Sequence, residues 1–395
     1  MGIIEMASDF GHARILPKYP AAAYQMNIRA ARTFCRLLLL LGALQSAACA
    51  GPTYYAQAIG GHLELMRQRQ PIAEVLDSDT AGPGLEAEID LDLRQKLVLS
   101  QEIRAFGVAR LDLPDNGSYT QFVWTGRDAV TWNVVATPEF SLTPRRWCFL
   151  FAGCLPYRGY FKQGSADRFA ERQAADGLDV AVSGASAYST LGWFEDPLLD
   201  TMLRYGDERL AAIIFHELAH QRLYLEGDAA FNESYASFVE EEGVARWLRE
   251  SGRSDRLPAW RQERAAARQF DTILRQARRA LAAVYASEQD PSARRRAKEA
   301  AFSALRADYR ALVDDHWGGR DRFGGWFASD LNNARLALLD TYRAGLCAFA
   351  TLYREAGEDM RRFHELAAAR ATLNGKARRA WLEQDCEGIA PSGEL

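Results

Sequence analysis

One motif constrains this chain of 395 residues more than any other, the HExxH sequence from His216 to His220 in an apolar, helix-forming segment. Residues four apart share one face of a helix, so His216 and His220 can offer two imidazoles to a single metal ion. Glu217 lies about 100° around the helix from His216, where it can act on a water molecule without binding the ion itself. The segment 210–250 is therefore expected to carry a metal site.

A catalytic zinc ion uses three protein ligands, drawn from imidazole nitrogen and carboxylate oxygen. Gly227 is expected to end the first helix, and Asp228 to cap a second, antiparallel helix. Glu233 is reached about 7.5 Å along that second helix, nearly level with His220, which lies about 9 Å before the end of its own helix. Glu240 would lie about 18 Å along, which is too far. Glu233 is therefore the expected third ligand, and Zn²⁺ the expected cofactor.

The chain also contains a partial copy of the motif. The sequence FHELA occurs at 215–219 and again at 363–367, but in the second copy Ala368 stands where the second histidine would be required. The second copy predicts an ordinary amphipathic helix. The alternative for the first copy is a pair of structural histidines with no metal at all.

The segment HELAH followed by NESYASFVEE resembles the gluzincin pattern, in which HExxH precedes an Asn-Glu pair on a second helix. Further strings resemble a bacterial family described as "putative aminopeptidase", from about residue 50 to about 370. These strings are YYAQA at 54–58, WCF at 147–149, GC at 153–154, PYRGYF at 156–161, AYSTLGWF at 187–194 and LNNARL at 331–336.

The resemblance implies a zinc metallopeptidase with His216, His220 and Glu233 as ligands and Glu217 as the catalytic residue. The aminopeptidase activity is an attribution made to the family as a whole. The sequence departs from the pattern in two respects. The separation of His220 from Glu233 is shorter than in the best-known gluzincins, and Arg222 stands where many such helices carry an apolar residue.

The beginning of the chain resembles an export signal. Met26 is the expected start, because basic residues then precede an apolar stretch at 37–44 and a small-residue region at 46–50. The apolar stretch is too short for a comfortable membrane span. Cys49 resembles a bacterial lipoprotein cleavage site, and simple cleavage after Ala50 is the alternative. The expected location is the periplasmic side of the envelope, with a lipid anchor at Cys49 in the outer membrane.

Export affects how the remaining cysteines are interpreted. In an oxidising compartment Cys148, Cys154, Cys347 and Cys386 could form two disulfides, and Cys148–Cys154 would close a short loop. The whole chain has a net charge of −4, and residues 50–395 carry an excess of seven acidic residues. This balance argues against nucleic acid as a partner, and the expected partner is a peptide substrate. Membrane contact is expected only through the anchor, and the oligomeric state is not predicted.

The coarse pattern predicts helices over 53–77 and 83–107, then strands at 121–124, 131–136, 146–151 and 180–190. Zincin folds place an edge strand beside the active-site helix for the substrate to pair with, and 185–191 is the candidate. An internal strand is the alternative interpretation of that segment. Residues 256–316 predict a long antiparallel helical hairpin interrupted at Pro291, and a further helix is expected over 330–353.

The expected fold class is α+β and zincin-like, mostly helical, with a small mixed sheet beside the HExxH helix and a C-terminal helical region. The expected divisions are a leader at 1–49, an N-terminal α+β part at 50–200, the metal-binding helix pair at 201–250 and a helical region at 251–395.

The expected reaction is metal-assisted peptide hydrolysis, in which Glu217 takes a proton from the attacking water and passes it to the leaving amine. Tyr342 and His316 are the candidates for stabilising the oxyanion, while Tyr224 and Tyr235 are interpreted as packing residues. An alternative function keeps the zinc but not the turnover, as an envelope lipoprotein that acts as an interaction module through the hairpin. An intact Glu217 speaks against that alternative, because a non-catalytic zinc site does not need it.

Overall fold

The computed structural model describes residues 51–77, 91–149, 153–188, 190, 194–287, 290–337 and 345–383. The predicted leader at 1–49, Tyr342 and Cys386 lie outside these residues. The described residues from 52 onward belong to one compact unit. No helix among the described residues is long and apolar enough to cross a membrane.

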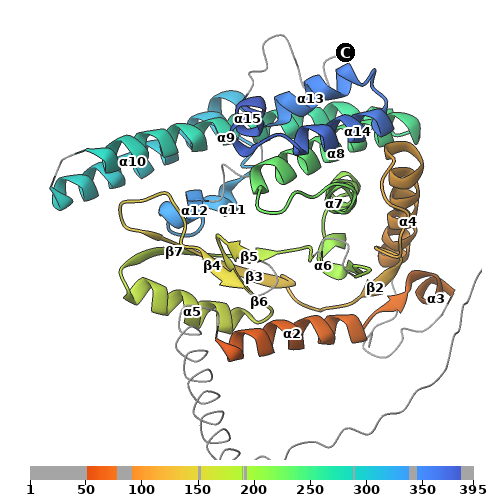
Figure 1. Cartoon of the computed structure of the whole chain (residues 1–395), viewed down its shortest axis with the longest axis horizontal. Helices are drawn as coiled ribbons and strands as arrows, with labels where there is room; N and C mark the ends of the chain where they lie inside the picture. Colours follow the sequence, from red (N-terminus) through yellow and green to blue (C-terminus); the bar gives the residue numbers. More distant parts are fainter. Residues whose placement is uncertain are drawn as a thin grey trace, which may run out of the picture. The chain divides into compact units, whose positions relative to one another are not determined.

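Helices dominate the described part of the chain, which also contains three small sheets (Figure 1). The α+β class expected from the sequence is confirmed. The N-terminal elements are α2 (Pro52–Arg67), β1 (Gln70–Pro71), α3 (Ile72–Asp77) and α4 (Leu91–Leu111). The segment 53–77 is thus two helices separated by a short strand, where Pro71 interrupts helical hydrogen bonding.

The strands form two sheets of three strands and one hairpin. In the mixed sheet, β2 pairs with β1 antiparallel and with β8 parallel. In the second sheet, β3 lies between β6 and β7 and is antiparallel to both. The bounds are β2 (Gln121–Val123), β3 (Thr131–Pro138), β4 (Trp147–Phe149), β5 (Gly153–Leu155), β6 (Arg158–Tyr160), α5 (Gln163–Ala175), β7 (Leu178–Ala185) and β8 (Leu198–Leu199).

The predicted substrate strand at 185–191 is wrong in its described residues. Strand β7 ends at Ala185, and the residues that follow it form a loop. The cause is a local network, because the buried carboxylate of Asp196 accepts hydrogen bonds from both the backbone and the hydroxyl of Thr190. A segment whose donors are satisfied within its own loop has no need of a partner strand.

The remaining elements are all helical. They are α6 (Asp200–Leu203), α7 (Asp207–Arg222), α8 (Ala229–Glu250), η1 (Ser254–Arg256), α9 (Leu257–Ala286), α10 (Pro291–Ala311), the π-helical turn η2 (Leu312–His316), α11 (Gly324–Phe327), α12 (Asn333–Ala337), α13 (Leu346–Glu355), α14 (Met360–Ala371) and α15 (Gly375–Leu382).

The predicted long hairpin is confirmed as α9 and α10, whose buried apolar residues form their own cluster. Asp290 caps α10 by accepting hydrogen bonds from Ser292 and Ala293, and Pro291 occupies the first turn, where its missing N–H costs nothing. The single helix expected over 330–353 is wrong: its described residues belong to two helices, α12 and α13, and Gly345 lies directly before the second.

Helix α7 runs through the centre of the largest hydrophobic cluster. Its residues 210–215 are buried with apolar side chains of α4, α8, α13 and α14, and with Phe122 and Leu198 from the mixed sheet. The mixed sheet thus shares the core of the HExxH helix, as expected. Gly243 of α8 allows the close approach of α7, because a β-carbon there would lie 2.9 Å from the Phe215 ring.

Candidate metal centre

The metal motif lies at the C-terminal end of α7, on a helix whose start is fixed by charge. Asp207 and Glu208 occupy the first turn, where carboxylates favour the positive end of the helix dipole. Helix α7 ends at Arg222 rather than at the predicted Gly227, because Leu223 adopts an extended backbone. Gly227 does have a left-handed backbone, with φ of 81°, but it lies in the connecting loop.

The loop between α7 and α8 is held at the start of α8. Asp228 caps that helix as predicted, accepting a hydrogen bond from the Phe231 amide at 3.0 Å. The side chain of Asn232 both accepts from the backbone N–H of Leu225 and donates to its carbonyl, each at 2.8 Å. These two hydrogen bonds hold the loop that precedes Glu233. The Asn of the Asn-Glu pair therefore has a structural role that orients α8 against α7.

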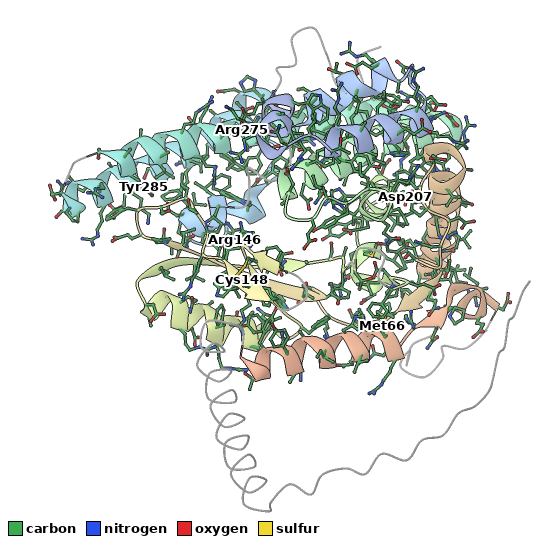
Figure 2. The ribbon with its side chains drawn as sticks, in the orientation of Figure 1. Met66, Arg146, Cys148, Asp207, Arg275 and Tyr285 are labelled. Carbon is green, nitrogen blue, oxygen red and sulfur yellow. A yellow bond between two sulfur atoms is a disulfide. The ribbon has the colours of Figure 1, made fainter. Side chains whose placement is uncertain are left out.

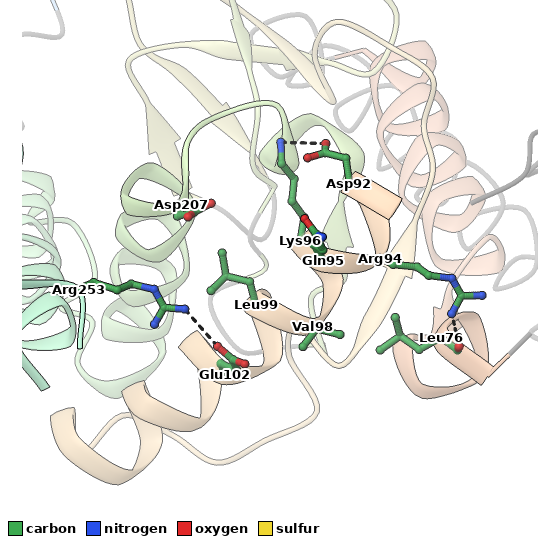
Figure 3. Close-up of a pocket in the computed structure, with 10 residues that line it drawn as sticks. All are labelled: Leu76, Asp92, Arg94, Gln95, Lys96, Val98, Leu99, Glu102, Asp207 and Arg253. Atoms are coloured by element: carbon green, nitrogen blue, oxygen red, sulfur yellow. Dashed lines mark hydrogen bonds and ion pairs between the residues drawn. The ribbon is translucent and has the colours of Figure 1, made fainter. Parts of the chain in front are cut away.

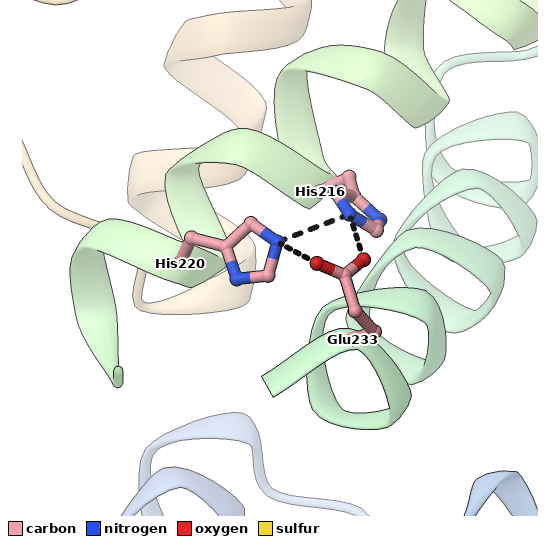
Figure 4. Close-up of side chains that lie close together, drawn as sticks. All are labelled: His216, His220 and Glu233. Carbon is pink, nitrogen blue, oxygen red and sulfur yellow. Dashed lines mark hydrogen bonds and ion pairs between the residues drawn. The ribbon is translucent and has the colours of Figure 1, made fainter. Parts of the chain in front are cut away.

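The structure brings His216, His220 and Glu233 together (Figure 4). The two Nε2 atoms of the histidines lie 3.2 Å apart. Glu233 reaches His216 Nε2 at 3.4 Å and His220 Nε2 at 3.6 Å through its two carboxylate oxygens. Within the described residues, this is the one group of three potential ligands of these types whose ligand atoms all lie within 4.8 Å of one another.

The donor set and its spacing fit a zinc ion. A tetrahedral ion with bonds of about 2.1 Å to nitrogen and oxygen separates its ligand atoms by about 3.4 Å. The three distances between these side chains lie on either side of that value. Two imidazoles and one carboxylate are also a known ligand set of catalytic zinc sites, in which the fourth position stays open.

A second carboxylate, Glu240, orients His216 from the other side of the ring. Glu240 Oε2 lies 3.1 Å from His216 Nδ1, so the imidazole donates there and directs its Nε2 lone pair toward His220 and Glu233. Arg264 donates to the other oxygen of Glu240 at 2.9 Å. Sequence spacing places Glu240 on the same helix face as Glu233, but too far along α8 to be a metal ligand. Its contact with His216 was not predicted.

The charges around the histidines are strongly coupled. Burial raises the pKa of Glu240, but the His216 hydrogen bond and the nearby Arg264 and Arg209 outweigh it and hold that pKa at about 2. Burial lowers the pKa of His216, while its bonds to Glu233 and Glu240 raise it to about 10. Burial and the charge of His216 lower the pKa of His220 to about 4. Without an ion, His216 is therefore protonated near neutral pH while His220 is neutral. Metal binding must displace the extra proton from His216.

Glu217 lies beside the cluster without belonging to it. Burial raises the pKa values of Tyr119 and Tyr157, and the charge of Glu217 raises them further. Burial lowers the pKa of His216, and the same charge is one of those that raise it. The side chain of Glu217 is half-buried. Such a position suits a general base, which must reach a water molecule while leaving the ligand positions to other residues.

Several other predicted residues have clear positions. Tyr235 is a packing residue as predicted: it is fully buried, stacks on Phe363 and donates to His364 at 2.7 Å. Tyr224 is not one, because it is 46% exposed with its ring 6.3 Å from that of His220. His316 is exposed at the end of η2 and has no hydrogen bond or ion pair to a site residue in the described part of the chain.

The partial motif copy at 363–367 lies in helix α14 and is structural, as the missing second histidine indicates. His364 is buried and bridges two elements, through Tyr235 of α8 and the carbonyl of Leu111 at the end of α4. Burial lowers its pKa to about 4, so it stays neutral in the folded protein at physiological pH.

A surface pocket of about 580 Å³ lies away from this chemistry, along α4 (Figure 3). Two pairs of the charged groups that line it neutralise one another, Lys96 with Asp92 and Arg253 with Glu102. Asp207 pairs with Arg256 outside the lining, and Arg94 donates to the Leu76 carbonyl. None of the metal-site residues lines the pocket. With its charged groups already bonded, it offers no convergent group for a ligand or a reaction.

The predicted disulfide between Cys148 and Cys154 is present in the β4–β5 hairpin, and Cys148 is labelled in Figure 2. Cys148 and Cys154 are directly opposite partners on the two strands and are joined by a disulfide. Cys347 is disulfide-bonded as well. Cys386, the fourth cysteine of the prediction, lies outside the described residues.

Comparison with known proteins agrees with the resemblance read from the sequence. The model of one protein family, described as "Putative aminopeptidase", matches residues 53–382, which is most of the chain. No curated protein matches the chain. No solved structure matches it either. The matched range includes α7, α8 and every residue of the candidate metal centre, and the chain belongs to the putative aminopeptidase family.

Proposed function

We propose that the chain is a zinc-dependent peptidase with a zincin-like active site. His216, His220 and Glu233 would hold Zn²⁺, and the reaction is the hydrolysis of peptide bonds. The observation that carries the proposal is the convergence of three ligand atoms at distances that suit a tetrahedral ion, with the Glu217 carboxylate beside them. The family description supports peptide hydrolysis and an aminopeptidase activity.

The bound zinc ion would supply a Lewis acid that polarises the scissile carbonyl and makes water acidic enough to attack near neutral pH. Glu217 accepts the proton from the attacking water and delivers it to the nitrogen of the leaving amine. Glu240 keeps His216 in the tautomer whose Nε2 faces the site, and Arg264 keeps Glu240 ionised. These roles divide binding, proton transfer and orientation among different carboxylates.

Peptide hydrolysis is tested with zinc-loaded protein that lacks the proposed leader at 1–49. The substrates are a peptide library with free or acetylated N-termini. The Glu217→Gln variant keeps the size of the side chain but removes the base, so it should lose at least about 10³-fold in kcat with its zinc content unchanged. Cleavage that requires a free N-terminus would establish aminopeptidase action. Zinc bound at one ion per chain without turnover would overturn the proposal and favour the interaction module.

We also propose that the protein acts in the bacterial envelope, anchored at Cys49. The support is the leader-like sequence before Cys49 and the disulfide between Cys148 and Cys154, since disulfides persist in oxidising compartments. In cells fed a labelled fatty acid, the wild type should carry the label and fractionate with membranes. Cys49→Ser should be unlabelled and soluble after cell lysis, and an unlabelled wild type would contradict the anchor.

A further inference from the structure

We propose that the ring of Tyr224 forms one wall of the substrate site beside the metal centre, where it packs against a large apolar side chain of the peptide. That side chain belongs to a residue next to the scissile bond, so Tyr224 favours peptides with an aromatic or large aliphatic residue there. The inference rests on the proposed peptidase function and adds a substrate class to it. The sequence predicts Tyr224 as a packing residue, but an exposed ring calls for another role.

The ring of Tyr224 lies against the side chain of a metal ligand. Its centroid is 6.3 Å from that of the His220 ring, and the two ring planes meet at 78° in an edge-to-face arrangement. Aromatic rings at this separation and angle are in favourable contact. His220 directs its Nε2 toward His216 and Glu233 (Figure 4). A peptide whose scissile carbonyl reaches the ion therefore comes within reach of the Tyr224 ring.

The local backbone explains why this ring faces outward. Leu223, which follows α7, has an extended backbone with φ of −149° and ψ of 118°. Successive side chains of an extended chain point to opposite sides. Leu223 and Leu225 are both partly buried and pack against the main hydrophobic core. Tyr224 between them therefore points away from the core, and it is 46% exposed.

Hydrogen bonds on both sides of Tyr224 fix the position of its backbone. The Leu223 amide donates to the carbonyl of Ala219 at 3.0 Å, which ties the residue to the last turn of α7. Both backbone groups of Leu225 are bonded to the Asn232 side chain, each at 2.8 Å. A tyrosine on a held backbone offers a large, rigid contact area at a low cost in conformational entropy, as a recognition surface requires.

Single exposed apolar side chains are common on protein surfaces, so exposure by itself does not indicate a site. Trp124, Phe194 and Tyr205 are the other exposed aromatic residues in the described part of the chain. None of the three has a ring contact with a metal-site residue among the described residues, whereas Tyr224 contacts His220. The combination of exposure and contact with a ligand distinguishes Tyr224 from them.

The metal-site side chains are themselves partly open to solvent. Glu233 keeps 21% of its side-chain surface exposed and His216 keeps 17%, whereas His220 is almost covered at 6%. A substrate can therefore approach the ligand atoms from outside. Tyr224 is the exposed aromatic side chain that such a substrate meets next to them.

The first test uses two series of short peptides, varied at the residue before or after the cleaved bond, with Phe, Leu, Ala and Gly at the varied position. The zinc-loaded wild type should show its highest kcat/KM for Phe or Leu in one series. Tyr224→Ala should lower kcat/KM for those peptides by about three- to tenfold, because an aromatic contact contributes about that much. The Ala and Gly peptides, which do not reach the ring, should change by less than about twofold.

Two further variants separate the ring from other effects. Tyr224→Phe keeps the ring and removes the hydroxyl, so it should keep the preference of the wild type within about twofold. Tyr205→Ala removes a tyrosine that is exposed to a similar degree, 45%, but lies before the start of α7, and it should leave every peptide unaffected. In Tyr224→Ala, an unchanged preference or an equal loss for all peptides would overturn the inference. A loss of activity in Tyr224→Phe would overturn it as well.

Peptide binding without turnover separates this inference from the proposed function. Zinc-loaded Glu217→Gln should leave peptides intact, so calorimetry can measure their Kd with Tyr224 present and with Tyr224→Ala added. The Phe peptide should bind about three- to tenfold more weakly to the double variant, and the Gly peptide equally to both. Equal Kd values for the Phe peptide would overturn the inference and leave the peptidase proposal intact. This binding preference in a wild type that never cleaves peptides would overturn the peptidase proposal alone.

Discussion

At the scale of single residues, the contact between Glu240 and His216 should determine how tightly zinc binds. Glu240→Gln keeps the shape of the side chain but removes the charge that fixes the His216 tautomer. Because supporting carboxylates of this kind contribute about 10- to 100-fold to metal affinity, the variant should lose zinc to a competing chelator at a correspondingly lower chelator concentration.

The neighbouring Glu241 supplies the control for this measurement. It lies on the same helix and pairs with Arg268 at 3.4 Å, whereas the carboxylate on His216 Nδ1 is that of Glu240. Glu241→Gln should therefore keep the zinc affinity of the wild type within about twofold. Equal losses from Glu240→Gln and Glu241→Gln would mean that general charge around the site, and not orientation of the histidine, sets the affinity.

The sequence predicted which residues meet at the site better than it predicted what supports them. His216, His220 and Glu233 follow from helical spacing over 18 residues, and the structure brings them together. Glu240 was excluded as a ligand by the same spacing, but a contact to the outer nitrogen of a ligand depends on side-chain rotamers that spacing does not specify.

At the scale of elements, the close crossing of α7 and α8 depends on Gly243. A methyl group there would lie 2.7 Å from Leu111 and 2.9 Å from the Phe215 ring. Gly243→Ala should therefore destabilise the protein by about 1–3 kcal/mol, despite the better helix propensity of alanine. The check is chemical denaturation of both proteins under the same conditions.

Gly60 of α2 provides the opposite case. No heavy atom lies within 4 Å of a β-carbon built there. Because the substitution only reduces the freedom of the unfolded chain, Gly60→Ala should stabilise the protein by about 0.5–1 kcal/mol. A Gly243→Ala that stabilises the protein as Gly60→Ala does would show that the contact between α7 and α8 is not as close as the structure has it.

Element types were easier to predict than element ends. The 4-3-4-3 spacing of apolar residues gave the α9–α10 hairpin, because one buried stripe must follow the helical period. Helix α7 ends five residues before the predicted glycine, since the loop is held by Asn232 and the backbone of Leu225. The predicted substrate strand is a loop because Asp196, from further along the chain, takes its hydrogen bonds. In both cases a side-chain hydrogen bond within the loop, which the spacing of apolar residues does not specify, determined the outcome.

At the scale of the whole molecule, His364 joins three separate parts of the core and makes stability depend on pH. It is neutral when folded because burial lowers its pKa to about 4, whereas the unfolded side chain titrates at 6.5. As pH falls below 6.5 the unfolded state gains a proton that the folded state does not, so this contribution is complete above pH 6.5 and is lost toward pH 4. The loss between pH 6.5 and 5 is about 2 kcal/mol.

The measurement is the free energy of unfolding at pH 7 and pH 5, for the wild type and for His364→Gln. The variant should be less stable at pH 7, because it loses the bonds to Tyr235 and to the Leu111 carbonyl, but its stability should fall less between the two pH values. Arg222, Asp112 and Asp359 also act on this histidine and are the same in both proteins. Parallel pH profiles would contradict the assignment.

The account as a whole depends on zinc at the junction of α7 and α8, and one titration tests it most directly. Zinc is removed with a chelator, the chelator is removed by dialysis, and peptide hydrolysis is followed as Zn²⁺ is added back. Activity should be absent in the metal-free protein and should rise to a plateau at one ion per chain, while Glu217→Gln takes up the same single ion without gaining activity. Peptide hydrolysis that persists in the metal-free protein, or a wild type that binds no zinc, would contradict the central claim.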